Sequence, residues 1–207
     1  MYLVKTPWIV KQIFPEFIWS IDTNEKNIYL TFDDGPHPSI TPFVLEVLKK
    51  YNAKATFFCI GKNVAAYNDV YKKIIDEGHR IANHTQQHLN GWKKDTETYV
   101  ENVISASKFI NSNLFRPPYG KLKRNQALSI IEKSYQIIMW DVLSGDFDKN
   151  ISKEKCLQNV ISKTQQGSIV VFHDSEKAFE KLSYCLPRVL EHFTQLGFTF
   201  KELPNFN

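Results

Sequence analysis

The stretch NIYLTFDDGPHP, residues 27–38, leads from an apolar run into two adjacent carboxylates and a Gly-Pro turn. Residues 27–32 are rich in β-branched and aromatic side chains, which predicts a strand. Asp33 and Asp34 follow, and adjacent side chains at a strand end point in opposite directions. One carboxylate can therefore bind a metal ion while the other stays free as a base. The same residues also suit a plain surface turn.

Comparable apolar runs recur along the chain and alternate with stretches of helical periodicity. This alternation predicts right-handed βαβ units and a mostly parallel sheet, either a closed (β/α) barrel or an open doubly wound sheet. No Gly-rich phosphate-binding motif follows a predicted strand, so nothing favours a nucleotide-binding fold. We predict the other strands over residues 16–21, 55–60, 80–83, 114–116, 136–142, 168–173 and 198–202, and helices over residues 40–51, 69–77, 96–111, 125–133, 153–165 and 177–195.

The composition excludes several classes of protein. Hydrophobic residues make up 43% of the 207 residues and charged residues 23%, as in an ordered globular protein. The net charge of +4 is too small to indicate nucleic-acid binding, and three scattered cysteines argue against a disulfide framework. No apolar run reaches the roughly 18–20 residues of a membrane span. The N-terminus also lacks the pattern of a signal peptide, so we expect a cytoplasmic chain or a processed form from the cell envelope.

Polar side chains end the predicted strands one after another. His84 and His88 follow the strand over residues 80–83, and we expect them to meet on one face of a helical turn, where both can hold one cation. Arg116 begins a stiff R-P-P-Y-G loop and can pair with a carboxylate. His173 ends an apolar strand, either as a satisfied core residue or as a general acid. In a (β/α) barrel, the working residues belong at such carboxyl ends.

Taken together and in this order, the motifs resemble those of the NodB-homology polysaccharide deacetylases, carbohydrate esterase family 4. The resemblance covers about residues 27–202. It implies a distorted (β/α) barrel of about seven parallel strands, with residues 1–207 as a single domain and residues 1–26 as an N-terminal extension packing on the barrel. The matching motifs are T-F-D-D-G at 31–35, H-T-x-x-H at 84–88, R-P-P-Y-G at 116–120, W-D…D-F at 140–147 and V-x-H at 171–173.

The resemblance also implies a divalent metal ion, with Zn²⁺ expected and Co²⁺, Ni²⁺ or Fe²⁺ as alternatives. In that family pattern Asp33 takes a proton from water and Arg116 orients Asp33. The backbone N–H of Tyr119 helps to bind the oxyanion, and His173 protonates the leaving amine. The implied substrate is an N-acetylated carbohydrate such as peptidoglycan, a chitin-like oligomer or poly-N-acetylglucosamine. The implied metal ligands are Asp34, His84 and His88.

The fourth motif departs from the family pattern D-x-x-D-W, because Leu143 stands at the first position and Phe147 at the last. We therefore expect the aspartate that raises the pKa of the catalytic histidine to be missing, unless Asp141 or Asp174 replaces it. Aromatic side chains in these loops can stack on sugar faces. The candidate substrate contacts are Trp92, Pro118, Trp140, Asp146 and Phe147.

Other functions remain open at this point. The same fold can deacylate a non-sugar amide, and an inactive relative can bind sugar without turning it over. Two histidines and a carboxylate also form the facial triad of non-haem iron oxygenases. That third alternative gives Asp33 and His173 no role. The sequence specifies no oligomeric state.

Overall fold

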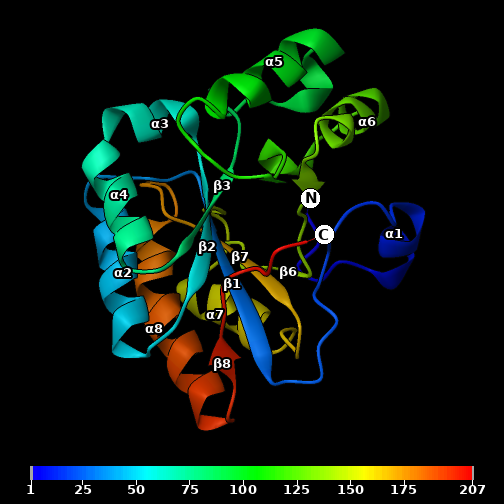
Figure 1. The fold of residues 1–207 in the computed structure, drawn as a ribbon. Coiled ribbons are helices and arrows are strands. Elements are labelled where there is room, and N and C mark those ends of the chain that lie inside the picture. Colours follow the sequence, from blue (N-terminus) through cyan, green and yellow to red (C-terminus); the bar gives the residue numbers. More distant parts are fainter. Residues whose placement is uncertain (1, 207) are drawn as a thin grey trace.

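The computed structural model describes residues 2–206 and has a parallel β-sheet at its centre (Figure 1). The strands follow the order β5-β4-β3-β2-β1-β7-β6, and β8 pairs with the beginning of β1. Every ladder between strands is parallel. The strands are β1 (Asn27–Asp33), β2 (Ala55–Cys59), β3 (Arg80–Asn83), β4 (Leu114–Phe115), β5 (Gln136–Ile137), β6 (Val142–Leu143), β7 (Ile169–His173) and β8 (Thr199–Phe200).

Strands β1 to β7 form a half-barrel of seven parallel strands, with β8 outside this path, which confirms the predicted distorted (β/α) barrel. Within residues 2–206 no ladder joins β5 to β6, so the barrel is open on that side. The predicted strand over residues 136–142 is wrong in one respect, because it is split into β5 and β6 by four residues without ladder pairing. A continuous apolar run, Ile137 to Trp140, crosses this break, so the sequence pattern does not reveal it.

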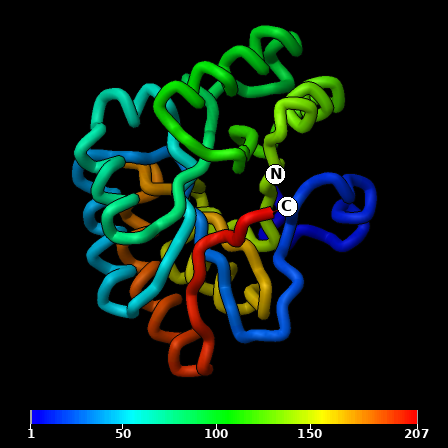
Figure 2. The backbone as a smooth tube through the Cα atoms, viewed as in Figure 1, coloured from blue at the N-terminus to red at the C-terminus, as the bar shows by residue number. Residues whose placement is uncertain are grey.

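N-terminal residues lie along the open side of the half-barrel (Figures 1 and 2). Lys5 pairs with Val142 of β6 in an antiparallel bridge, and Ile18 pairs with Ile138 just beyond β5. The strand predicted over residues 16–21 is therefore wrong as a strand, since it makes only isolated bridges. These bridges still satisfy backbone groups at both free edges of the sheet.

Six predicted helices are confirmed, although the helices over 96–111 and 153–165 end earlier than predicted. Two further short helices, α1 (Trp8–Ile13) and α3 (Gly61–Ala66), span six residues each, too few for periodicity to indicate them. No helix within residues 2–206 is long and apolar enough to cross a membrane. The confirmed helices are α2 (Ile40–Lys50), α4 (Asn68–Asp76), α5 (Thr96–Ala106), α6 (Arg124–Glu132), α7 (Lys153–Ile161) and α8 (Phe179–Gln195).

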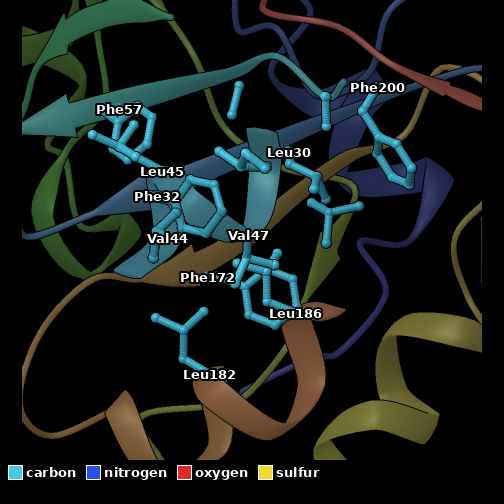
Figure 3. Packing of buried hydrophobic residues seen from close by; sticks show 14 of the residues in the cluster. Leu30, Phe32, Val44, Leu45, Val47, Phe57, Phe172, Leu182, Leu186 and Phe200 are labelled. Carbon is cyan, nitrogen blue, oxygen red and sulfur yellow. The ribbon is translucent and has the colours of Figure 1, made fainter. Parts of the chain in front are cut away.

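The main core lies between the central strands and helices α2 and α8 (Figure 3). Phe32 stacks on Phe57 at 5.0 Å and on Phe172 at 6.2 Å between ring centroids, which ties β1 to β2 and β7. Leu45 and Leu186 cover these rings from α2 and α8, and each fully buried side chain of this size contributes roughly 1.5–3 kcal/mol. This packing fixes the register in which Asp33 lies opposite His173 at the carboxyl ends of β1 and β7.

Candidate active site

Asp34, His84 and His88 converge at the carboxyl end of the sheet. One ligand atom of each lies within 4.8 Å of the others. Asp34 Oδ1 is 3.1 Å from His88 Nε2 and 3.8 Å from His84 Nε2. That oxygen is buried and makes no hydrogen bond. A buried carboxylate oxygen facing two imidazole nitrogens without a hydrogen bond is the arrangement expected of ligands directed at a common cation.

The two histidines meet through a loop and not through the predicted helical turn, which is wrong. Residues 84–88 are non-helical, and Thr85 and His88 have positive φ angles of 68° and 56°. Asn83 supports the loop by accepting a hydrogen bond from the Thr85 N–H at 2.8 Å. The two imidazoles, four residues apart in the sequence, therefore meet because the loop between them adopts this strained conformation and not because of helical geometry.

The protonation states also suit a divalent cation. His84 Nδ1 lies 2.8 Å from the backbone carbonyl oxygen of Arg116. Because a carbonyl oxygen can only accept a hydrogen bond, Nδ1 carries the proton, and the unprotonated Nε2 faces Asp34. Burial lowers the pKa of His84 to about 4, so its imidazole is neutral at pH 7. Burial raises the pKa of Asp34, but His88, His173 and His84 outweigh it and hold the pKa below its usual range. One carboxylate and two imidazoles thus fit a metal ion.

Asp33 forms a buried ion pair with Arg116, with 2.7 Å between Oδ1 and Nη1. The guanidinium also donates to Thr31 Oγ1 at 2.8 Å and to the carbonyl oxygens of Ile138 and Met139 at 3.2 and 2.9 Å. Its carbon lies 4.0 Å from the centre of the Phe58 ring. These contacts fix Arg116 in one orientation, and Arg116 in turn fixes the carboxylate of Asp33.

His173 is paired with Asp146, which accepts from the His173 backbone N–H at 2.7 Å and lies 2.8 Å from Nδ1. Burial lowers the pKa of His173, but the charge and hydrogen bond of Asp146, helped by Asp34 and Asp33, raise it to about 9. The expected loss of the carboxylate is therefore wrong, because Asp146 raises the pKa of this histidine despite Leu143. Asp146, predicted as a substrate contact, is fully buried and pairs with His173.

The two proposed substitutes for that carboxylate serve elsewhere, so this prediction is also wrong. Asp141 is buried and bound by Lys5 at 2.5 Å and Lys11 at 2.7 Å. Asp174 accepts from the Gly35 N–H at 3.0 Å and from the Thr41 hydroxyl, which secures the turn after Asp34. Burial raises the pKa of Asp174 to about 8.

The R-P-P-Y-G loop lies beside the two histidines. Tyr119 has a positive φ of 61°, and its ring centroid is 4.6 Å from that of His88. Gly120 also has a positive φ, and a Cβ atom there would lie 2.6 Å from the Trp140 ring, so the tight packing of this loop needs glycine. Pro118 is buried, so it supports the loop and offers little surface to a ligand.

The three aromatic residues predicted to contact substrate lie at different places relative to the candidate active site. The Phe147 ring lies edge-on to His173 with 5.1 Å between centroids, next to the acid–base groups. Trp140 is half-buried against Gly120 and lies 5.9 Å from the Arg116 guanidinium. Trp92 is 60% exposed, contacts Lys121 and donates to the Leu122 carbonyl oxygen. Sequence reasoning missed Thr31 and Asn83 as supports of the site, since neither stands out from the strand pattern around it.

Comparison with known proteins gives the family. The family model for polysaccharide deacetylases matches residues 20–138. A peptidoglycan-N-acetylglucosamine deacetylase of Bacillus cereus is 31% identical over 96% of this chain and 73% of its own length. A chitooligosaccharide deacetylase of Azorhizobium caulinodans is 34% identical over 74% of this chain and 76% of its own length. The chain belongs to the polysaccharide deacetylases, the hydrolases of carbohydrate esterase family 4.

Solved structures agree with this assignment. The crystal structure of a peptidoglycan N-acetylglucosamine deacetylase with a bound N-hydroxybenzamide superimposes with a TM-score of 0.88, at 30% identity, and covers 96% of this chain and 95% of that one. A mutant of a family 4 pseudoenzyme with restored activity gives a TM-score of 0.78 at 26% identity, covering 90% of this chain and 69% of that one. The half-barrel is thus shared with a deacetylase and with a mutant of a pseudoenzyme.

Proposed function

We propose that this protein is a metal-dependent deacetylase that hydrolyses the N-acetyl groups of N-acetylglucosamine-type residues in a poly- or oligosaccharide and releases acetate. One observation supports this proposal most strongly. An Asp/His/His cluster, the Asp33–Arg116 pair and the Asp146–His173 pair lie together at the carboxyl end of the sheet. Amide hydrolysis needs a base for water and a separate acid for the leaving nitrogen, and these pairs can supply both.

In this proposal Asp34, His84 and His88 hold the metal ion, most simply Zn²⁺. The bound ion supplies Lewis acidity, polarising the acetyl carbonyl and lowering the pKa of a nearby water. Asp33, held by Arg116, takes one proton from water as the oxygen adds to the acetyl carbon. The Tyr119 backbone N–H, in a loop stiffened by two prolines, donates to the developing oxyanion.

His173 completes the reaction. With a pKa of about 9 its imidazole is protonated at neutral pH, so it can give a proton to the amide nitrogen as the C–N bond breaks. Acetate and a free amino sugar are the products. Phe147 beside His173 and Tyr119 beside His88 are suited to contact the sugar ring, because aromatic faces pack against the apolar faces of sugars.

An inactive, sugar-binding relative is the second candidate, and the similarity to a pseudoenzyme favours testing it directly. Such a protein would be expected to lack at least one of the base, the acid or a metal ligand. In this chain Asp33, His173 and all three ligand residues are present. The site therefore favours turnover.

The substrate class is tested by measuring acetate release from three substrates in parallel: N-acetylglucosamine oligomers, peptidoglycan and a simple N-acetylated amine. We expect release from at least one of the two carbohydrates and none from the amine. Release from the amine alone would replace the carbohydrate with a non-sugar amide. Binding of oligomers without release from any of the three would favour the inactive relative.

A further inference from the structure

We infer that Tyr2 is a positioning residue for the proposed general acid, acting through the loop that carries Asp146; this inference rests on the proposed function. Tyr2 lies far from His173 in the sequence. The two are nevertheless linked by an unbroken series of contacts across the open side of the half-barrel.

The first link is the backbone of the N-terminal segment. The Leu143 N–H donates to the Val4 carbonyl oxygen at 2.8 Å, and the Thr6 N–H donates to the Asp141 carbonyl oxygen at 2.9 Å. Lys5 bridges Val142 between them and binds the buried carboxylate of Asp141. Residues 4–6 are thereby held along the outer edge of β6, directly before the loop at residues 144–148.

The second link is the side chain of Tyr2, which touches that loop on both sides of Asp146. Its hydroxyl donates to Asp148 Oδ2 at 3.0 Å, and its ring lies 5.2 Å from the Phe147 ring. The hydroxyl also lies against Gly145, where a Cβ atom would come within 2.6 Å of it. Burial, together with Asp148, raises the pKa of Tyr2 to about 12, so the hydroxyl stays a donor at all working pH values.

The last link is from the loop to the acid. Phe147 packs edge-on against His173 at 5.1 Å, and Asp146 bonds both the backbone and Nδ1 of His173. Gly145 has a positive φ of 79°, a conformation that other residues rarely adopt, so the tight turn of this loop needs glycine. Tyr2 contacts Gly145, Phe147 and Asp148 together, and so holds the loop on both sides of Asp146. Tyr2 therefore helps to set where Asp146 and the imidazole of His173 lie.

The test compares Tyr2→Ala with Tyr2→Phe and with Leu3→Ala, an exposed neighbour in the same segment. We expect Tyr2→Ala to lower kcat by about tenfold or more while KM stays within about twofold, since small misplacements of a catalytic group are costly. Tyr2→Phe keeps the ring on Phe147 and should retain most of kcat. Leu3→Ala should match the parent.

A second readout does not depend on turnover. The proton on His173 Nδ1, hydrogen-bonded to Asp146, should give a downfield NMR signal in the parent, and Tyr2→Ala should shift or broaden it. An unchanged signal and unchanged kcat in Tyr2→Ala would overturn the inference. If the parent releases no acetate, the proposed function fails, and the NMR comparison alone still decides the role of Tyr2.

Discussion

Asp146 accepts two hydrogen bonds from His173, one from the backbone N–H at 2.7 Å and one from Nδ1 at 2.8 Å. A single buried carboxylate thus fixes both the position of the residue and the orientation of its ring. It also holds the imidazole in its charged form, because the attraction outweighs the cost of burial. The pH dependence of the protein should therefore depend on this pair.

The variant Asp146→Asn should move the alkaline limb of the pH–rate profile to lower pH. With the carboxylate gone, burial dominates and the pKa of His173 falls from about 9 to its ordinary value of ~6.5 or below. The acid form is then lost near neutral pH, and kcat at pH 8 should drop by about tenfold or more. Asp76→Asn, on the exposed face of α4, is the matched control. An unchanged alkaline limb would remove Asp146 from this role.

The Asp146–His173 pair should also make the free energy of unfolding decrease as the pH rises. A raised pKa in the folded state means that the folded protein binds the proton more tightly than the unfolded chain. The contribution of His173 to the free energy of unfolding is therefore fully present below pH ~6.5 and disappears as pH rises through about 9. Urea unfolding at pH 6 and pH 9.5 should show this loss in the parent and not in Asp146→Asn; equal losses in both would contradict it.

Asp33→Asn should fold and keep its metal ion but lose turnover by roughly 10²–10⁴-fold, the usual contribution of a positioned base. The amide retains the shape of the side chain and its contact with Arg116, while it can no longer accept the proton. Acetate release and metal content measured on the same sample check this. Activity close to that of the parent would exclude Asp33 as the base.

Arg116→Ala should destabilise the protein by about 3–5 kcal/mol, because the buried carboxylate of Asp33 would lose its partner. Arg116→Lys should recover only part of this loss, since an ammonium cannot reach Thr31 and the carbonyl oxygens of Ile138 and Met139 together. Urea midpoints compare the two variants. Equal stability of Arg116→Lys and the parent would show that the fork geometry of the guanidinium does not matter.

His84→Ala should abolish bound metal ion, whereas His192→Ala on α8 should leave it unchanged. His84 Nε2 faces Asp34 because Nδ1 is held by the Arg116 carbonyl oxygen, so the variant removes the nitrogen that points toward the other two ligand residues. Metal content after dialysis against Zn²⁺ and desalting is the measurement. Full occupancy in His84→Ala would remove it from the ligand set.

The sequence predicted most of the sheet and the separate site residues, since these depend on local patterns. Hydrophobic runs gave β1, β2, β3 and β7 within a residue or two of their observed bounds. The break between β5 and β6 was not predicted, because an apolar run continues through it; in the structure the N-terminal segment pairs with residues on both sides of the break.

The contacts between site residues were harder to predict than the residues themselves. Asp146 precedes His173 by 27 residues, and only the adjacent placement of β6 and β7 brings its carboxylate beneath that ring. Asp174 is adjacent to His173 in the sequence, yet its carboxylate is held by Gly35 and Thr41, and Asp141 is held by Lys5 and Lys11. Distance along the chain therefore does not indicate which carboxylate pairs with His173, and tertiary contacts decide it.

In the proposed mechanism, a metal ion held by Asp34, His84 and His88 enables amide hydrolysis. The most direct test measures acetate release from N-acetylglucosamine oligomers and peptidoglycan by the purified protein, before and after removal of metal with a chelator, and again after addition of Zn²⁺. We expect release that disappears with the chelator and returns with the metal ion. Release that persists in a sample shown to be free of metal would contradict it.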